Sequence, residues 1–233
     1  MSRIKVLFLG NSHTYFNDMP ELFSRLCKAG SGLDVEPFML SHPGRTLEWH
    51  LREYYELRFN LLYGHYDYCV IQQAAHPFPG KPETLRDLDR IIELCRKGNA
   101  QPIIVETWAE KRYPEHQEIM NETYREAAES HDALLAPVGE IWQRICRDHP
   151  EAELYWRDGE HASPYGDYLI ACTLYRVMTG RLAAALPDEG IDFFKGLDAE
   201  PDGSRAVEDS EQIRIQLDPA DCRSIRSVVD EIV

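Results

Sequence analysis

Residues 4–14 read IKVLFLGNSHT, an apolar run that ends at Gly10 and passes directly into the polar segment Asn11–Thr14. Five of the first six side chains are apolar, which is typical of a strand covered on both faces of a parallel sheet. A polar loop at the carboxyl end of such a strand lies where α/β proteins bind their ligands. We therefore expect this stretch to form a strand covered on both faces, and Ser12 is the first candidate functional residue.

Strand-like and helix-like patterns alternate through the first three quarters of the chain. The predicted strands are Ile4–Leu9, Asp34–Leu40, Tyr68–Gln72, Pro102–Glu106 and Ala133–Pro137. The predicted helices are Met19–Ala29, Thr46–Leu62, Lys81–Lys97, Tyr113–His131, Gly139–Asp148 and Ser163–Thr179. Such alternation predicts parallel strands joined by crossover helices. The expected fold is α/β, a three-layer α/β/α sandwich around a five-stranded parallel sheet.

Local signals indicate where the first of these helices begins and ends. Asn17 or Asp18 is expected to cap the first helix, and Gly30 is expected to stop it. The apolar pattern weakens after Gly180, and Ile213–Leu217 alternates like a short strand before a final helix that runs through Ile232. We expect residues 1–180 to form one domain, and residues 181–233 to be an extension packed on it.

The composition excludes several classes of partner. A formal net charge of −15 opposes binding to nucleic-acid backbones or anionic membranes, so neutral or cationic substrates fit better. No stretch approaches the roughly 20 apolar residues of a membrane span, and the amino end carries no signal-peptide pattern, which predicts a cytoplasmic protein. The six cysteines form no Cys-x-x-Cys pair, so reduced, buried thiols are expected. The oligomeric state is left open.

A second polar motif, Asp158-Gly159-Glu160-His161, precedes a predicted helix start at Ser163-Pro164. A serine hydroxyl is almost inert at neutral pH unless an imidazole takes its proton and a third group holds that imidazole. Ser12, His161 and Asp158 supply these three groups, with Glu160 as a second choice for the carboxylate. Taken singly, each motif is more often a turn or a helix cap than a catalytic site. Together they predict an ester-cleaving serine hydrolase.

Residues 10–20, GNSHTYFNDMP, combined with Asp158–His161, resemble the first and last blocks of the SGNH (GDSL-type) hydrolases. The match is to the branch whose first block reads Gly-Asn-Ser and continues to Asn-Asp-x-Pro, so Asn11 replaces the usual aspartate. The resemblance covers residues 4 to about 180 and implies a flavodoxin-like SGNH hydrolase fold.

This resemblance also implies an oxyanion hole, a set of N–H groups that binds the negative oxygen formed during ester cleavage. Its expected donors are the backbone N–H groups of Ser12 and Gly44 and a side-chain amide of the third block. That block normally reads Gly-x-Asn-Asp, whereas this chain has QQAAH at residues 72–76. Gln72 is the expected amide donor, with Gln73 as the next choice.

Further side chains are expected to surround the site. Gln73, His13 and Trp108 are assigned to substrate binding, although a place in the core is an equally good reading of Trp108. His42 and His76 are expected beside or behind the reacting groups. No zinc-binding helix, phosphate-binding loop or dinucleotide motif is present in the sequence, so no metal or cofactor is expected.

The expected activity is hydrolysis of small acyl esters, with acetyl esters of carbohydrates as the leading substrates. The alternative is a catalytically degenerate protein of the same fold that binds a glycan or another ligand. The altered third block and Asn11 favour that alternative. A flavodoxin-like cofactor carrier is disfavoured, because no loop rich in Ser and Thr follows the first strand.

Overall fold

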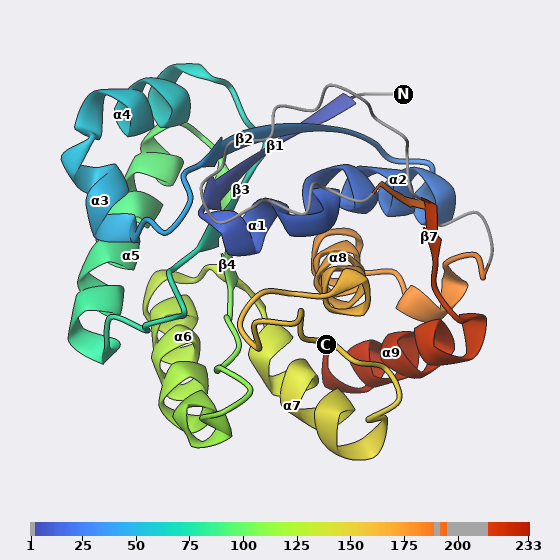
Figure 1. Cartoon of the computed structure of the whole chain (residues 1–233). Helices are drawn as coiled ribbons and strands as arrows, with labels where there is room; N and C mark the ends of the chain where they lie inside the picture. Colours follow the sequence, from blue (N-terminus) through green and yellow to red (C-terminus); the bar gives the residue numbers. More distant parts are fainter. Residues whose placement is uncertain (1–2, 189–191, 195–213) are drawn as a thin grey trace, which may run out of the picture.

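The structure is a computed structural model that describes residues 3–188, 192–194 and 214–233 of the chain. Its centre is a five-stranded parallel sheet with helices on both faces, which confirms the predicted fold (Figure 1). The strands are β1 (Arg3–Gly10), β2 (Asp34–Ser41), β3 (Tyr68–Gln72), β4 (Gln101–Val105) and β5 (Leu134–Ala136). All five predicted strands are present, and each end lies within one residue of its predicted position.

Strand order in the sheet is β2-β1-β3-β4-β5, so the order reverses at β1, which pairs with β2 on one side and β3 on the other. In open α/β sheets, ligands bind outside the carboxyl ends of the strands at such a reversal. Ser12 follows β1 after one residue, and Gln72 ends β3. The topology therefore brings the candidate nucleophile to the usual ligand-binding edge.

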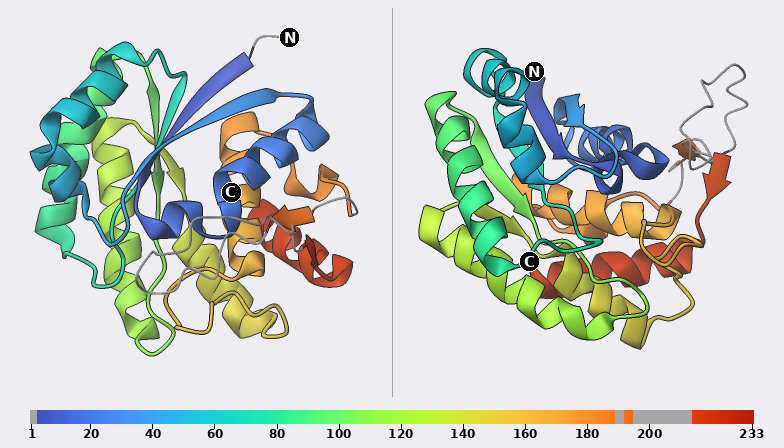
Figure 2. Two further views of the ribbon diagram at one scale, coloured as in Figure 1. Left: turned by 45° about the horizontal axis from the view of Figure 1, so that its top comes forward. Right: turned by 60° about the vertical axis from the view of Figure 1, so that its left-hand side comes forward.

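Each face of the sheet is covered by its own layer of helices, as the two further views in Figure 2 show. One layer contains α2 (Met19–Ser31), α7 (Val138–Asp148), α8 (Pro164–Thr179) and α9 (Pro219–Ile232). The other contains α3 (Leu47–Arg52), α4 (Tyr54–Tyr63), α5 (Lys81–Lys97) and α6 (Gln117–His131). Successive residues of β1 alternate between the two cores, with Phe8 in the first and Leu7 and Leu9 in the second.

The single helix predicted over Thr46–Leu62 is wrong, because the chain breaks at Glu53 into α3 and α4. The buried leucines do not predict this break, because in one continuous helix Leu47, Leu51, Leu57 and Leu61 would fall within an arc of about 120° on one face. The periodicity therefore indicates a single helix. The chain leaves the helical conformation at Glu53, whose ψ is 48°.

Two other predicted boundaries are also corrected. The helix expected to stop at Gly30 continues to Ser31 and ends at Gly32, which has the left-handed φ of 73°. Gly30 is instead a packing glycine, since a Cβ there would lie 2.7 Å from the Tyr175 hydroxyl. The helix predicted from Tyr113 begins with a 3₁₀ turn at Pro114–His116, and α6 starts at Gln117.

The carboxyl-terminal part of the chain contributes a 3₁₀ turn, η3 (Ala183–Ala185), an antiparallel pair formed by β6 (Asp192–Phe194) and β7 (Arg214–Gln216), and α9. Ile213, the first residue of the strand predicted here, lies outside the described residues. α9 packs against α7, α8 and η3, and its Ile225 and Val229 belong to the core on that side of the sheet. We keep the division of the chain at residue 180 as a proposal.

None of the helices within the described ranges combines the length and the apolar composition that crossing a membrane requires.

Candidate active site

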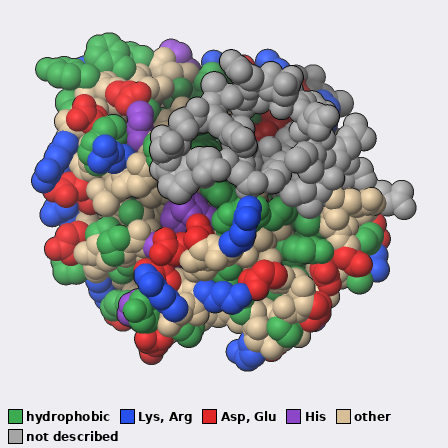
Figure 3. Space-filling model, in the orientation of Figure 1, with side chains coloured by type: hydrophobic (Ala, Val, Ile, Leu, Met, Phe, Trp, Pro, Cys, Tyr) green, Lys and Arg blue, Asp and Glu red, His purple; other side chains and the backbone are tan. Residues whose placement is uncertain are grey.

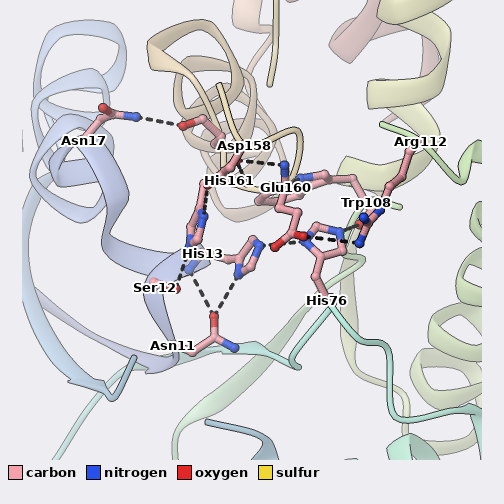
Figure 4. Close-up of polar contacts among 11 residues, drawn as sticks. Asn11, Ser12, His13, Asn17, His76, Trp108, Arg112, Asp158, Glu160 and His161 are labelled. Carbon is pink, nitrogen blue, oxygen red and sulfur yellow. Dashed lines mark hydrogen bonds and ion pairs between the residues drawn. The ribbon is translucent and has the colours of Figure 1, made fainter. Parts of the chain in front are cut away.

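Ser12 and His161, which are 149 positions apart in the sequence, are in direct contact in the structure (Figure 4). The distance from Ser12 Oγ to His161 Nε2 is 2.8 Å, and the distance from His161 Nδ1 to Asp158 Oδ2 is 2.7 Å. Because the Asp158 carboxylate only accepts hydrogen bonds, Nδ1 carries the proton and Nε2 is free to accept from the Ser12 hydroxyl. The three predicted side chains therefore form one continuous hydrogen-bonded chain in the arrangement of a Ser-His-Asp triad.

Ser12 is placed by a tight turn between β1 and α1 (Ser12–Tyr15), a short helix that the sequence did not predict. Asn11 caps this helix, and its Oδ1 accepts from the His13 N–H at 3.0 Å. Gly10 is required because a Cβ at this position would lie 2.3 Å from Thr14 Oγ1 and 2.6 Å from Gln72 Oε1. The Ser12 N–H, at the first helical position, has no earlier carbonyl of its own helix to bond.

His161 lies in a loop, residues 155–163, that directly precedes α8 and that we call the His161 loop. Backbone contacts within this loop fix its shape. The Trp156 N–H donates to the His161 carbonyl at 2.8 Å, and Tyr155 pairs with Ala162. Ser163 Oγ accepts from the first N–H groups of α8, which confirms its predicted role as the cap. The backbone is therefore held on both sides of the imidazole.

Asp158 holds both the imidazole and the backbone of this loop. Its Oδ1 accepts from the N–H groups of Glu160 and His161, at 2.9 and 3.0 Å. Partial burial disfavours ionisation, but the hydrogen bonds from these N–H groups and from the His161 ring outweigh it and hold the pKa of Asp158 below its ordinary value. Asp158 is thus a carboxylate at neutral pH. Glu160, the second choice from sequence, contributes its backbone N–H to Asp158, and the carboxylate that contacts the His161 ring is that of Asp158.

The imidazole of His161 is sandwiched between two aromatic rings. Phe16 lies on one face with ring centroids 4.7 Å apart, and His13 lies on the other at 4.5 Å and 13° from parallel. Behind His13, His76 Nε2 donates to the Trp108 carbonyl at 3.0 Å, so the neutral His76 ring accepts from His13 Nε2 through Nδ1, also at 3.0 Å.

These two supporting histidines are uncharged at neutral pH. Burial, together with the neighbouring rings of His161 and His76, holds the pKa of His13 well below its ordinary value. Burial likewise lowers the pKa of His76. The rings of His13 and His76 therefore constrain the orientation of His161 without adding a competing positive charge.

The Gln72 amide, the expected side-chain donor to an oxyanion, bonds to neighbouring groups of the protein. Gln72 Oε1 accepts from the Asn11 N–H at 3.2 Å and from the Thr14 hydroxyl at 2.8 Å, and its Nε2 donates to the Gln73 carbonyl. The amide oxygen and one of the two N–H groups of Nε2 thus have partners within the protein, and donation by the second N–H to an oxyanion stays a prediction. Gln72 ties the end of β3 to the turn that carries Ser12.

The three side chains assigned to substrate binding lie beneath the site rather than on its surface. Trp108 is fully buried and stacks on Trp142 with centroids 4.3 Å apart, so its alternative reading as a core residue is correct. Gln73 is fully buried as well, and its Oε1 accepts from the Leu47 N–H at 2.9 Å. His13 is 6% exposed and supports His161, as described above.

Gly44 lies in an exposed turn with a left-handed φ of 67°. This turn is held beside the Ser12 turn, because Asn11 Nδ2 donates to the Arg45 carbonyl at 3.0 Å. A role for the Gly44 N–H in an oxyanion hole stays a prediction.

Sequence reasoning considered Asn17 only as a helix cap and gave Asp167 no role, yet they form a second link between the two segments that carry Ser12 and His161. Asn17 Nδ2 donates to Asp167 Oδ2 at 2.6 Å and to the Ala162 carbonyl at 3.0 Å. The Asn-Asp-x-Pro part of residues 10–20 contained the only sequence signal for this link.

Within the described ranges, no group of three or more His, Cys, Asp or Glu side chains is arranged to hold a metal ion.

No family model and no curated protein sequence matches this chain. Solved structures do match. A DUF4886 family protein from Bacteroides uniformis has a TM-score of 0.70 at 18% identity, over 99% of this chain and 94% of its own. An acetylxylan esterase from Geobacillus stearothermophilus, solved as a catalytic mutant, has a TM-score of 0.63 at 14% identity, over 74% of this chain and 93% of its own.

A member of the lipolytic G-D-S-L family from Veillonella parvula has a TM-score of 0.61 at 12% identity, over 76% of this chain and 99% of its own. The acetylxylan esterase and the lipolytic protein thus match about three quarters of the chain, and the Bacteroides uniformis protein matches nearly all of it. The strand order, the two helical layers and these neighbours agree with the resemblance seen in residues 10–20 and 158–161. The chain therefore has the fold of the SGNH (GDSL-type) hydrolases.

Proposed function

We propose that this protein is a serine esterase that hydrolyses small acyl esters. The observation that carries the proposal is the hydrogen-bonded chain from Ser12 Oγ through His161 to Asp158, at 2.8 and 2.7 Å. These distances are within the range in which an imidazole accepts a proton from an attacking hydroxyl.

In the proposed mechanism, His161 Nε2 takes the proton of Ser12 as Ser12 Oγ attacks the ester carbonyl. Asp158 stabilises the imidazolium through Nδ1, and the backbone N–H groups of Ser12 and Gly44 are the proposed donors to the oxyanion. The imidazolium then protonates the departing alcohol, which leaves an acyl-serine. Water hydrolyses this acyl-serine with His161 as the base, which restores the free serine.

Acetyl esters of carbohydrates are the substrates we favour. The acetylxylan esterase among the structural neighbours supports this choice by analogy of fold. Surface charge also supports a neutral substrate. Figure 3 shows histidine side chains at the surface near the centre of the face, with both acidic and basic side chains around them. A surface of mixed charge, on a chain with a net charge of −15, offers no positive electrostatic potential that would concentrate an anionic substrate.

The alternative function is ligand binding without cleavage. The third block favours it, because the side-chain oxygens of Gln72 and Gln73 and the Nε2 of Gln72 are all bonded within the protein. The Nε2 of Gln73 is buried and has no hydrogen-bond partner among the described residues. A binding protein of this kind would not need an activated serine.

A fluorophosphonate probe separates the two functions, because it reacts covalently only with an activated hydroxyl. The parent protein is expected to be labelled at Ser12 and to hydrolyse p-nitrophenyl acetate, and Ser12→Ala is expected to lose both properties. Ser227→Ala, which changes an exposed serine on α9, is the matched control and should behave as the parent does. Absence of labelling in the parent, or equal labelling in Ser12→Ala, would overturn the proposal.

A further inference from the structure

Asn17 and Asp167 are a buried pair of polar side chains that joins the same two segments of the chain as Ser12 and His161 do. Figure 4 shows Asn17 near the triad residues. Asn17 belongs to η1 (Phe16–Asp18), five residues after Ser12, and Asp167 lies in the first turn of α8, six residues after His161. The contacts made by Asn17 join residues 145 and 150 positions apart, against 149 for Ser12 and His161. Two independent links therefore connect the same two segments.

The Asn17 amide has a defined orientation. The Ala162 carbonyl can only accept a hydrogen bond, so the NH₂ end of the amide must face it, and Asp167 Oδ2 accepts from the same nitrogen. Asp167 thus aligns the donor that holds Ala162, and Ala162 is the residue directly after His161. This contact is therefore one of those that hold the backbone next to His161.

Asn17 adopts a backbone conformation that few side chains tolerate, with φ 47° and ψ 28°. Asparagine is one of the residues that enter this left-handed region, although the region costs free energy unless the surroundings hold the residue there. Asn17 is 4% exposed and directly follows Phe16, whose ring stacks on His161. The kink at Asn17 therefore directs its own amide and the neighbouring ring toward the His161 loop.

Asp167 is a costly residue for this place in the protein. It is fully buried, its Oδ1 has no hydrogen-bond partner among the described residues, and burial raises its pKa well above the ordinary value. A buried carboxyl group that is half satisfied destabilises the fold relative to an apolar side chain. Packing alone does not explain it, but the alignment of the Asn17 amide does.

We infer that Asn17 is a positioning residue that sets the distance between Ser12 Oγ and His161 Nε2 by holding the Ala162 carbonyl, and that Asp167 orients the Asn17 amide for this contact. The inference rests on the proposed esterase function and extends it to residues that touch neither substrate nor reacting atoms. Displacement of a reacting group by 1 Å costs on the order of 100-fold in rate, so loss of this contact should act mainly on kcat.

Two substitutions at residue 17 test the inference. Asn17→Asp keeps the shape of the side chain but removes both N–H donors. Asn17→Gly keeps the left-handed backbone without strain and removes the side chain. Each is expected to lower kcat for p-nitrophenyl acetate by about tenfold or more, while KM changes by less than about threefold. Asn99 is exposed and has a similar φ of 62°, so Asn99→Asp and Asn99→Gly are matched controls that should keep the parent kcat.

The double variant Asn17→Asp with Asp167→Asn separates positioning from folding. The amide introduced at position 167 can donate to the carboxylate introduced at position 17, which restores a hydrogen bond between the pair. No side-chain donor at position 17 then faces the Ala162 carbonyl. The melting temperature is expected to recover toward that of the parent while kcat stays low. A parent-like kcat in Asn17→Asp, in Asn17→Gly or in the double variant would overturn the inference.

A measurement without turnover keeps this test distinct from that of the esterase function. In ¹⁵N-labelled protein, the resonance of His161 Nε2 reports its hydrogen bond to Ser12, and Ser12→Ala supplies the reference for the broken bond. Asn17→Gly is expected to move the resonance toward that reference, and Asn99→Gly is not. An unmoved resonance in Asn17→Gly would reject the positioning role even if the protein proved to have no esterase activity.

Discussion

The imidazole of His13 lies against that of His161, with ring centroids 4.5 Å apart and planes 13° from parallel. The residue directly after Ser12 therefore supports the base that Ser12 contacts. With Phe16 on the opposite face, the His161 ring keeps a fixed plane, and its Nε2 keeps pointing at the Ser12 hydroxyl. The short segment from Ser12 to Phe16 thus supplies both the proposed nucleophile and the two rings that hold its base.

Replacement of His13 by Ala is expected to lower kcat by about tenfold with little change in KM, because His161 gains room to rotate away from Ser12. His13→Phe keeps a flat ring in the stack and should retain most of the activity. It leaves His76 Nδ1 without its donor, which should cost about 1–3 kcal/mol of folding free energy. Steady-state kinetics and thermal unfolding of both variants check this, and a parent-like kcat in His13→Ala would contradict it.

Replacement of Asp158 by Asn is expected to lower kcat by about 10²- to 10⁴-fold. The amide cannot stabilise an imidazolium, and it allows the His161 tautomer in which Nε2 carries the proton and cannot accept from Ser12. The melting temperature should change little, because the Asp158 side chain is 40% exposed and the amide oxygen can still accept from the loop N–H groups. Unchanged kinetics would remove Asp158 from the proposed mechanism.

Gln72 is expected to act through the fold of the Ser12 turn. Gln72→Ala leaves the Asn11 N–H and the Thr14 hydroxyl without their acceptor, which should cost about 1–3 kcal/mol for each group and lower the melting temperature. Gln72→Glu, as a neutral carboxylic acid, keeps an acceptor for both groups and a donor for the Gln73 carbonyl, so it should retain activity.

A direct catalytic role of Gln72 as an oxyanion donor would give a different result. Loss of an oxyanion donor typically lowers kcat by about 10²- to 10³-fold without unfolding the protein. If Gln72→Glu shows that loss at an unchanged melting temperature, the original assignment of Gln72 to the oxyanion hole would be restored.

Glu106 should make folding stability depend on pH. It follows β4, is fully buried, and accepts from the Glu140 N–H at 2.7 Å, while its Oε2 has no partner among the described residues. Burial raises the pKa of Glu106 from 4.5 to about 7. The folded state therefore binds this proton more tightly than the unfolded state, so the stabilisation is complete below pH 4.5 and is lost as pH rises through 7.

The full difference amounts to about 3 kcal/mol at 1.36 kcal/mol for each pKa unit. Glu106→Gln removes this titration and keeps an oxygen for the Glu140 N–H. The gain in melting temperature over the parent should be larger at pH 8 than at pH 5. Glu118→Gln, at an exposed position of α6, is the control and should show no such difference. An equal offset at both pH values for Glu106→Gln would contradict the prediction.

The positions of most strands and helices could be predicted from the sequence, because they depend on local patterns of apolar and capping residues. The bounds predicted for β3 and α5, Tyr68–Gln72 and Lys81–Lys97, agree with the structure at both ends. Ser163 and Pro164 mark the start of α8 by cap chemistry that needs no distant partner. The break between α3 and α4 was missed, because the leucines on both sides of it are spaced as on one face of a single helix.

The amino-acid sequence by itself determined which segments become strands and helices, and it placed Ser12, Asp158 and His161 at the ends of those segments, since periodicity and capping act over a few residues. Only the tertiary structure decided what Gln72, Trp108 and Asn17 contact. Gln72 bonds to Asn11, Trp108 to the Glu160 carbonyl and Asn17 to Asp167, and these partners are 61, 52 and 150 positions away. The direction of a polar side chain depends on which donors and acceptors the packed neighbours place beside it.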